Sequence, residues 1–249
     1  MAILISMAAS STLFACVKSV RWSHDPPFSV ELPGGEIGGL DIDLQREILQ
    51  RLDCEMTLIN LPWARALKEL EIGRLDILPG AYRRPEREKY AYFAGPVLVS
   101  RNVLFAHVDA VDKWPITRLT ELVNTDFKLG AQLGVSYGKD YDLLVQDANY
   151  QKKIVYNGKR GNLWRMIEAG RLDGIVADEL TGQIELNDLE FSNKIIMTSV
   201  IVSDESAEIA FSKQSTTPEF LQKYQAVVDE LRKEGGIKAI ASKYGIKQH

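Results

Sequence analysis

Arginine side chains that could hold an anion are concentrated in one polar loop. Residues 80–88 carry Arg83, Arg84 and Arg87. A guanidinium presents two parallel donors that match a carboxylate, and the same loop supplies Glu86 and Glu88. We expect Arg83 and Arg84 to pair with these glutamates on a solvated turn. For Arg87 the loop alone leaves both a local ion pair and a binding role open.

Residue types for metal binding and nucleophilic catalysis are sparse. The two cysteines, Cys16 and Cys54, lie 38 positions apart, and the three histidines, His24, His107 and His249, are dispersed. This spacing predicts neither a disulfide framework nor a metal site. No nucleophile is followed by a recognisable base. We therefore expect no metal, no cofactor and no catalytic residue.

A charged hexapeptide occurs twice, as residues 71–76 and 168–173, with five of six positions identical at an offset of 97. In both copies a helix-like segment stops at a glycine, Gly73 or Gly170, and a short apolar run follows. This pattern predicts a helix, a glycine C-cap and a buried strand. The offset is too long for a solenoid. Two similar α/β lobes with a cleft between them are the expected arrangement.

The composition suits a two-lobed protein of ordinary size. The 249 residues are 45% hydrophobic, the formal net charge is −4, and Lys and Arg are scattered along the chain. Nucleic-acid binding needs a concentrated basic surface, so nucleic acid is not an expected partner.

The first 17 residues are apolar and rich in small residues, with no charge before Lys18. They resemble the apolar region of a secretory signal peptide, although the usual positive start is missing. We predict a signal peptide over residues 1–16. Leu13–Cys16 also loosely resembles a lipoprotein cleavage site, so lipid attachment at Cys16 is an alternative. No other stretch approaches 18 apolar residues, so the mature chain should be soluble.

Strands and helices alternate through the first third of the chain. The expected order is a strand over 17–22, a helix capped by Asp41 or Asp43, a strand over 56–61, the repeat helix from Pro62, and a strand over 76–79. Such alternation predicts right-handed crossovers and a mostly parallel sheet.

The middle of the chain restarts the same alternation. Residues 97–105 are an apolar run that we expect to cross between lobes, and residues 195–202 should return. Two amphipathic helices separated by Gly235 and Gly236 should end the chain. The predicted division is lobe 1 over 17–106 and 203–249, with lobe 2, residues 107–202, inserted.

Several short motifs, weak individually, occur in a specific order: Pro27-Phe28, residues 39–44, 73–76, 84–87, 133–138, 170–179, 235–237 and 243–245. Over residues 17–246 this order resembles the bacterial extracellular solute-binding proteins of polar amino-acid ABC importers, family 3. The resemblance implies the type II periplasmic binding protein, or Venus flytrap, fold: two lobes, each a mostly parallel sheet flanked by helices.

The resemblance also implies an amino-acid clamp with one charge from each lobe. Arg87 would hold the ligand carboxylate and Asp178 its ammonium group. For Asp178 the alternative is a helix cap. Backbone N–H groups at Tyr82 and Ser136 would add donors to the carboxylate, and Gly134 would let the backbone approach closely. An ordinary turn is the alternative for this loop.

Trp63 stands where the family packs an apolar residue on the ligand side chain; a core position is the alternative. Three positions differ from the family pattern, so the sequence does not predict which side chain the ligand carries. Gly80 replaces a frequent serine, Asp25 falls near a usual aromatic residue, and Tyr82 replaces a small hydroxyl residue.

The expected function is a monomeric periplasmic protein that captures a small polar solute, chiefly an α-amino acid, for a membrane permease of an ABC importer. One alternative is an enzyme similar to cyclohexadienyl dehydratases, for which Glu179, Asp25 or His24 could serve as the acid. Another is a sensory ligand-binding module with the same fold.

Overall fold

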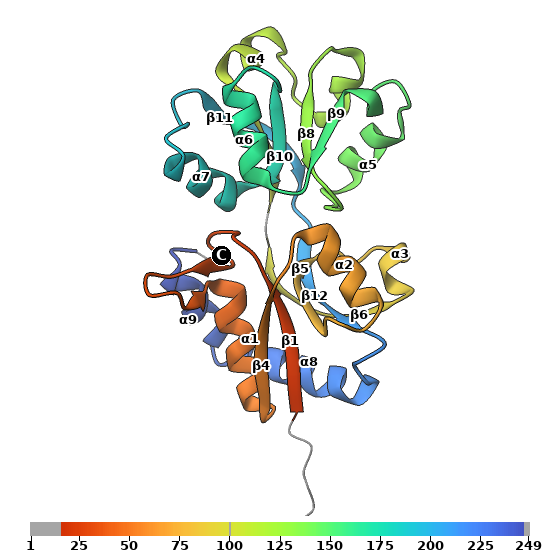
Figure 1. The fold of residues 1–249 in the computed structure, drawn as a ribbon, viewed down its shortest axis with the longest axis vertical. Coiled ribbons are helices and arrows are strands. Elements are labelled where there is room, and N and C mark those ends of the chain that lie inside the picture. The colour runs from red at the N-terminus through yellow and green to blue at the C-terminus, as the bar shows by residue number, and fades with distance from the viewer. Residues whose placement is uncertain (1–15, 100, 247–249) are drawn as a thin grey trace, which may run out of the picture.

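The computed structural model describes residues 16–99 and 101–246 and shows two α/β lobes stacked along the long axis (Figure 1). Each lobe contains one five-stranded sheet. The first sheet has the order β4 (Cys54–Asn60), β1 (Cys16–Trp22), β5 (Ile77–Ala81), β12 (Ser206–Ser212) and β6 (Ala91–Val99). The second has the order β11 (Ile195–Ser203), β7 (Asn102–His107), β10 (Gly174–Asp178), β8 (Leu129–Gln132) and β9 (Ile154–Asn157). The predicted two-lobed α/β fold, with one lobe inserted in the other, is confirmed.

Both sheets are mixed, with a single reversed strand. β12 runs antiparallel to β5 and β6, while β1, β4 and β5 are parallel. In the second sheet β7 is the reversed strand, antiparallel to β10 and β11. Because the remaining strands of each sheet share one direction, their carboxyl ends point toward the space between the lobes. Ligands of such sheets bind beyond the carboxyl ends of the strands.

The crossing between lobes lies earlier than the sequence predicts. The run 97–105 contains the end of β6 and the start of β7, and β7 pairs only within the second sheet among the described strands. A boundary after residue 106 would leave β7 in the first lobe, so that boundary is wrong by one strand. The chain returns between β11 and β12, close to the predicted position.

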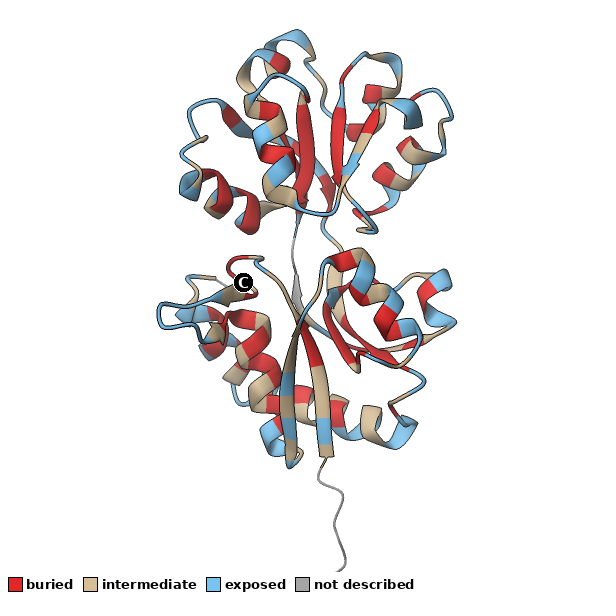
Figure 2. Ribbon diagram, viewed as in Figure 1, coloured by how far each residue is buried: buried red, intermediate tan, exposed pale blue. Residues whose placement is uncertain are grey.

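Helices cover both faces of each sheet, and buried residues line the strands and the inward helix faces (Figure 2). In the first lobe α1 (Leu40–Arg51), α8 (Pro218–Lys233) and α9 (Gly236–Lys243) share one apolar cluster, and α2 (Trp63–Glu71) contributes to another; α3 (Pro85–Glu88) follows β5.

In the second lobe there are two apolar clusters. One contains α4 (Val108–Lys113), the 3-10 helix Leu119–Asn124 and α5 (Lys139–Gln146), and the other contains α6 (Arg160–Glu168) and α7 (Glu179–Asp188). A hairpin of β2 (Val30–Glu31) and β3 (Ile37–Gly38) and a 3-10 turn, Gln151–Lys153, complete the described elements.

The repeated hexapeptide has the structural role that its pattern predicts. Gly73 and Gly170 end their helices with φ values of 75° and 68°, a left-handed conformation that glycine adopts without penalty. Asp76 accepts hydrogen bonds from the N–H and hydroxyl of Ser19 at 2.8 and 2.7 Å. Asp173 likewise accepts the N–H of Lys128 at 2.7 Å. In each lobe the aspartate therefore ties the loop before the central strand to a neighbouring strand.

Helix α1 does not begin at the predicted aspartate cap. Gly39 is the N-cap residue, with φ 112°, and no side chain caps the helix. A Cβ at Gly39 would lie 2.4 Å from the carbonyl oxygen of Phe28, so only glycine fits there. Asp41 and Asp43 lie instead in the first turn, where carboxylates interact favourably with the helix dipole.

Cys16 and Cys54 form a disulfide between β1 and β4. The prediction that these cysteines form no disulfide is wrong, because residues 38 apart in sequence are direct partners in the parallel strand register. The predicted signal peptide lies outside the described residues except for Cys16. In this structure the Cys16 sulfur is bonded to Cys54, and lipid attachment would need that sulfur.

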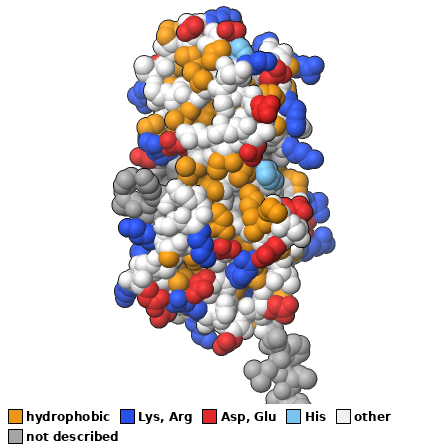
Figure 3. Space-filling view, turned by 90° about the vertical axis from the view of Figure 1, so that its left-hand side faces the viewer, with side chains coloured by type: hydrophobic (Ala, Val, Ile, Leu, Met, Phe, Trp, Pro, Cys, Tyr) orange, Lys and Arg blue, Asp and Glu red, His pale blue; other side chains and the backbone are white. Residues whose placement is uncertain are grey.

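The surface view shows Lys and Arg interspersed with Asp and Glu over both lobes, while hydrophobic side chains gather at mid-height, where the lobes meet (Figure 3). Within residues 16–99 and 101–246, no helix combines the length and apolar character that crossing a bilayer requires.

Candidate functional site

A cavity of about 510 Å³ lies between the lobes and takes residues from both. Its size is within the range of small-molecule sites, on the order of 300–1,000 Å³. It is lined by residues at or just after the carboxyl ends of β1, β4, β5, β8, β9 and β10. Every predicted site residue except Gly134 contributes to its wall: Asp25, Trp63, Gly80, Tyr82, Arg87, Ser136 and Asp178.

Arg87 belongs to α3 and lines the cavity, and only 6% of its surface is exposed. It does not pair with Glu86 or Glu88. Its Nη1 donates to the Tyr82 carbonyl at 2.9 Å and its Nη2 to the Gly134 carbonyl at 3.3 Å. Burial lowers the pKa of Arg87 from its ordinary value. A guanidinium has five N–H donors, so these two bonds leave donors for a ligand carboxylate.

Asp178 closes β10 and caps α7. Its carboxylate accepts the N–H of Thr181 at 3.0 Å, so the cap that the sequence left as an alternative is present. A carboxylate accepts about four hydrogen bonds, so capping and ligand binding are compatible. The neighbouring Thr181 lines the cavity, and its hydroxyl is buried without a partner among the described residues.

Gly134 brings a loop of the second lobe against the first. Its carbonyl accepts the indole N–H of Trp63 at 3.0 Å as well as the Arg87 bond. Gly134 has φ +80°, and a Cβ there would lie 3.2 Å from the Cβ of Ala64. The close approach expected of Gly134 is therefore an approach to α2, at the rim of the cavity.

Ser136 and Tyr82 take part in contacts between the lobes. The Ser136 hydroxyl accepts from Nε of Arg84 at 3.0 Å, and Arg84 also pairs with Glu205 at 2.7 Å. The expectation of a solvated local turn is wrong for Arg84. Arg83 is exposed and pairs with Glu88, as expected, and with Glu208.

The Tyr82 hydroxyl accepts from Asn102 at 2.6 Å. Burial raises the pKa of Tyr82 above its ordinary value. The phenol therefore stays neutral around pH 7 and serves as a polar group of the cavity wall.

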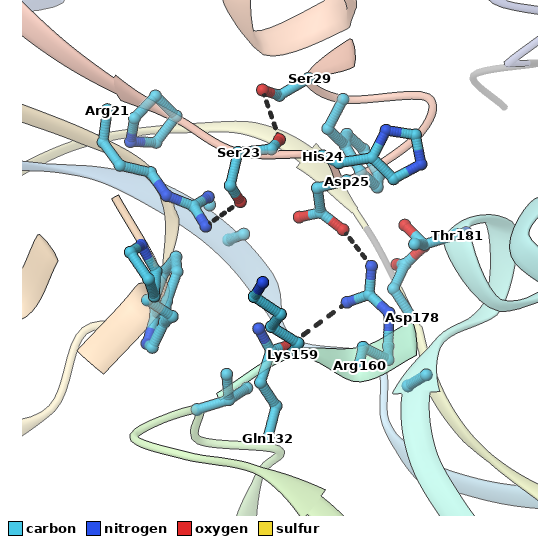
Figure 4. A pocket seen from close by; sticks show the side chains of 18 of the residues that line it. Arg21, Ser23, His24, Asp25, Ser29, Gln132, Lys159, Arg160, Asp178 and Thr181 are labelled. Carbon is cyan, nitrogen blue, oxygen red and sulfur yellow. Dashed lines mark hydrogen bonds and ion pairs between the residues drawn. The ribbon is translucent and has the colours of Figure 1, made fainter. Parts of the chain in front are cut away.

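Asp25 forms an ion pair between the lobes in the cavity wall. Arg160, the first residue of α6, places Nη2 2.6 Å from Asp25 (Figure 4). Its Nε lies 2.7 Å from Glu185. Glu185 also accepts the indole N–H of Trp164 at 2.6 Å. Burial opposes the charge on Arg160, but the pairs with Asp25 and Glu185 prevail and raise its pKa. Asp25 is thus engaged by the protein itself.

Gly80 and Asp41 are neighbours in the first-lobe wall of the cavity. Gly80 has φ +74°, and a Cβ there would lie 3.8 Å from the Asp41 carboxylate. Asp41 is half-buried and lines the cavity. Burial, reinforced by the charge of Asp25, raises its pKa from 3.8 to about 7. Asp41 is therefore a carboxyl group that titrates close to neutral pH.

Sequence reasoning missed Arg21, Asp41, Lys159, Arg160 and Glu185 as cavity residues. The 97-residue offset contains a signal for one of them. Helices α2 and α6 have nine residues each and start at positions 63 and 160, an offset of 97. Trp63 is a candidate from the sequence, so its equivalent Arg160 could have been one too. For the others no comparable signal exists.

The described residues contain no group of three or more His, Cys, Asp or Glu side chains arranged to hold a metal ion.

Residues 20–247 match the bacterial extracellular solute-binding proteins, family 3. The chain belongs to this family. A curated relative, ABC transporter arginine-binding protein 1 of Escherichia coli, is 26% identical over 154 residues, which span 61% of this chain and 59% of the relative. Less than two thirds of that relative is therefore covered.

Two solved structures share the fold across most of the chain. An ancestral arginine-binding protein bound to arginine has a TM-score of 0.79 at 20% identity, covering 92% of this chain and 98% of the other. A histidine kinase sensor domain with similarity to periplasmic binding proteins has a TM-score of 0.77 at 20% identity, covering 93% and 96%. At this identity the likeness concerns the fold alone, since one fold hosts several functions.

Proposed function

We propose that this chain captures a single α-amino acid between its lobes in the periplasm and delivers it to the permease of an ABC importer, acting as a monomer. The observation that carries the proposal is the position of Arg87 and Asp178. They come from different lobes and line the same cavity. A guanidinium on one wall and a carboxylate on the other complement the carboxylate and ammonium of an amino acid.

Binding would work through closure of the lobes. A ligand that touches both walls stabilises only the state in which both are present. Two hydrogen bonds already join the lobes in this structure: Trp63 and Arg87 of the first lobe both donate to the Gly134 carbonyl of the second. The ligand would add its own bonds to them, so that the closed state becomes the dominant one.

The disulfide supports the proposed compartment. Disulfides persist in oxidising environments such as the periplasm. Because the Cys16 sulfur is in the bond to Cys54, we propose that the signal peptide ends before Cys16, one residue earlier than predicted, and that the exported protein keeps Cys16 without a lipid. Mass spectrometry of the exported chain tests this: a diacylglycerol adduct on Cys16 contradicts it.

Calorimetric titration of the mature chain with the twenty amino acids tests the binding function. At least one should bind with a micromolar or tighter Kd, and Arg87→Gln should weaken it by about tenfold or more, because a charge-assisted bond contributes about 1.5–3 kcal/mol. Failure of all twenty to bind, or equal binding by the variant, contradicts the proposal.

We propose binding without turnover. Of the acids suggested for a dehydratase, Glu179 is ion-paired with Arg101 and does not line the cavity, whereas Asp25 is paired with Arg160. His24 lines the cavity. Incubation of the same preparation with prephenate and arogenate should release no carbon dioxide; its release would favour the enzyme.

A further inference from the structure

Arg21 is a buried cation in the cavity wall that no carboxylate of the described chain neutralises by contact. It is 7% exposed and lies near the end of β1. Its Nε donates to the Leu61 carbonyl at 3.1 Å and its Nη2 to the Ser23 hydroxyl. No acidic side chain among residues 16–99 and 101–246 lies within ion-pair distance of it. Burying a charge without such a partner is costly, which points to a partner from outside the protein.

The nearest acidic residues do not fill that role. Asp25 and Asp41 are close enough to favour the charge on Arg21. Asp25, however, is held by Arg160 at 2.6 Å. Asp41 has its pKa raised to about 7 by burial, so it carries only part of a charge near neutral pH.

Arg21 also covers the aromatic surface that a cationic ligand would use. Its Cζ lies 5.4 Å from the centroid of the Trp63 ring, a cation–π distance. A ligand with an ammonium or guanidinium side chain would have to displace Arg21 or lie beside a like charge. A side chain that carries a negative charge meets neither obstacle.

A second cation approaches from the other lobe. Lys159 precedes α6, is exposed and lines the same cavity, and its ammonium has no acidic partner within ion-pair distance in the described part of the chain. Arg21 and Lys159 extend from opposite sides toward the space between them (Figure 4). Closure of the lobes would therefore place two cations around one ligand group.

The charges of the cavity wall agree with this arrangement. The lining cations are Arg21, Arg87, Lys159, Arg160 and Arg165, and the lining anions are Asp25, Asp41, Asp178 and Glu185. Arg160 engages two anions, Asp25 and Glu185. If the amino-acid backbone takes Arg87 and Asp178, the remaining wall has four cations, Arg21, Lys159, Arg160 and Arg165, and three anions, Asp25, Asp41 and Glu185. This excess of one positive charge grows when Asp41 is protonated.

We propose that Arg21 and Lys159 form a side-chain subsite for a carboxylate, so that the ligand is an acidic α-amino acid. This inference rests on the proposed function, and it names the substrate class of the same site. It separates this chain from the arginine-binding proteins whose fold it shares.

The test is a calorimetric comparison of L-glutamate and L-aspartate with L-glutamine, L-asparagine and L-arginine at pH 6, below the Asp41 pKa of about 7. At least one acid should bind about tenfold or more tightly than its amide, since one charge-assisted bond is worth about 1.4 kcal/mol or more. Arg21→Met and Lys159→Met should each reduce that preference several-fold. Arg171→Met, which removes an exposed cation of the second lobe outside the cavity, should keep it within twofold.

The outcomes separate the two proposals. If an amide or arginine binds more tightly than the acids, the subsite is wrong while the amino-acid function stands. If no amino acid binds, the function itself fails and the subsite with it. Should Arg21→Met not fold, Lys159→Met decides, because Lys159 is exposed; an unchanged preference in that variant contradicts the subsite.

Discussion

Trp63 and Arg160 are equivalent residues of an internal repeat, and both line the cavity between the lobes. Each is the first residue of a nine-residue helix. The strands that follow, β5 and β10, have five residues each and keep the same offset. The repeat thus gives each lobe a helix start at the cleft, with an aromatic ring on one wall and a cation on the other.

The ion pair between Asp25 and Arg160 should favour closed lobes even without a ligand. Asp25→Asn removes the charge that joins Arg160 to the first lobe and leaves Glu185 as its remaining partner. We expect a more open ligand-free population and a larger radius of gyration by small-angle X-ray scattering. Glu47→Gln is the control, because Glu47 pairs with Arg51 within α1. An unchanged radius of gyration in Asp25→Asn would contradict the expectation that this ion pair favours closed lobes.

The repeated aspartates should stabilise their lobes more than the repeated arginines. Asp76→Ala leaves the N–H and hydroxyl of Ser19 without their acceptor, and this should lower the free energy of unfolding by roughly 1–3 kcal/mol. Arg74→Ala changes a side chain that is 71% exposed and should stay within about 0.5 kcal/mol of the parent. Urea unfolding measures both. Equal effects would show that Asp76 has no special structural role.

Asp41 should make stability fall as pH rises toward neutrality. Its pKa in the folded chain is about 7, above the ordinary 3.8, so the folded state holds this proton more tightly than the unfolded state. The resulting stabilisation is complete below about pH 4 and is lost as pH rises to about 7, at no more than about 1.4 kcal/mol per pH unit.

The measurement for Asp41 is urea unfolding at several pH values, compared between the parent and Asp41→Asn. The asparagine cannot titrate, so the difference in unfolding free energy between the two proteins should change with pH over this window. A difference that is constant from pH 4 to 7 would mean that the Asp41 pKa is not raised.

The disulfide should contribute measurable stability. In the chain-entropy account, closing a loop between cysteines 38 residues apart stabilises by roughly 3–4 kcal/mol. Cys16→Ser with Cys54→Ser should therefore lower the thermal midpoint, and dithiothreitol should lower it in the parent alone. If dithiothreitol leaves the thermal midpoint of the parent unchanged, the disulfide contributes little to stability.

Local patterns in the sequence predict most of the fold because they report local physics. The glycine after each repeat helix and the apolar run that follows it are enough to identify α2, β5, α6 and β10. The disulfide and the early entry into the second lobe depend instead on which strands are neighbours in a sheet. Pairing between distant segments leaves no local mark in one sequence.

The candidate site likewise contains residues that the sequence predicts and residues whose roles depend on contacts between the lobes. Arg87 and Asp178 come from a resemblance to a family, and the structure places both on one cavity. The roles of Asp25 and Arg84 could not be predicted, since their partners, Arg160 and Ser136, belong to the other lobe. Arg21 has the sequence context of an ordinary strand residue, and only the cavity reveals where its guanidinium lies.

The clamp made by Arg87 and Asp178 is tested most directly by titrating the best-binding amino acid beside two analogues, one without the α-carboxylate and one without the α-ammonium. Each analogue should bind the parent at least about tenfold more weakly, because each loses a charge-assisted bond. Arg87→Gln should no longer discriminate against the first analogue, and Asp178→Asn should no longer discriminate against the second. Analogues that bind as tightly as the amino acid, or variants that keep the parent's discrimination, would contradict the clamp.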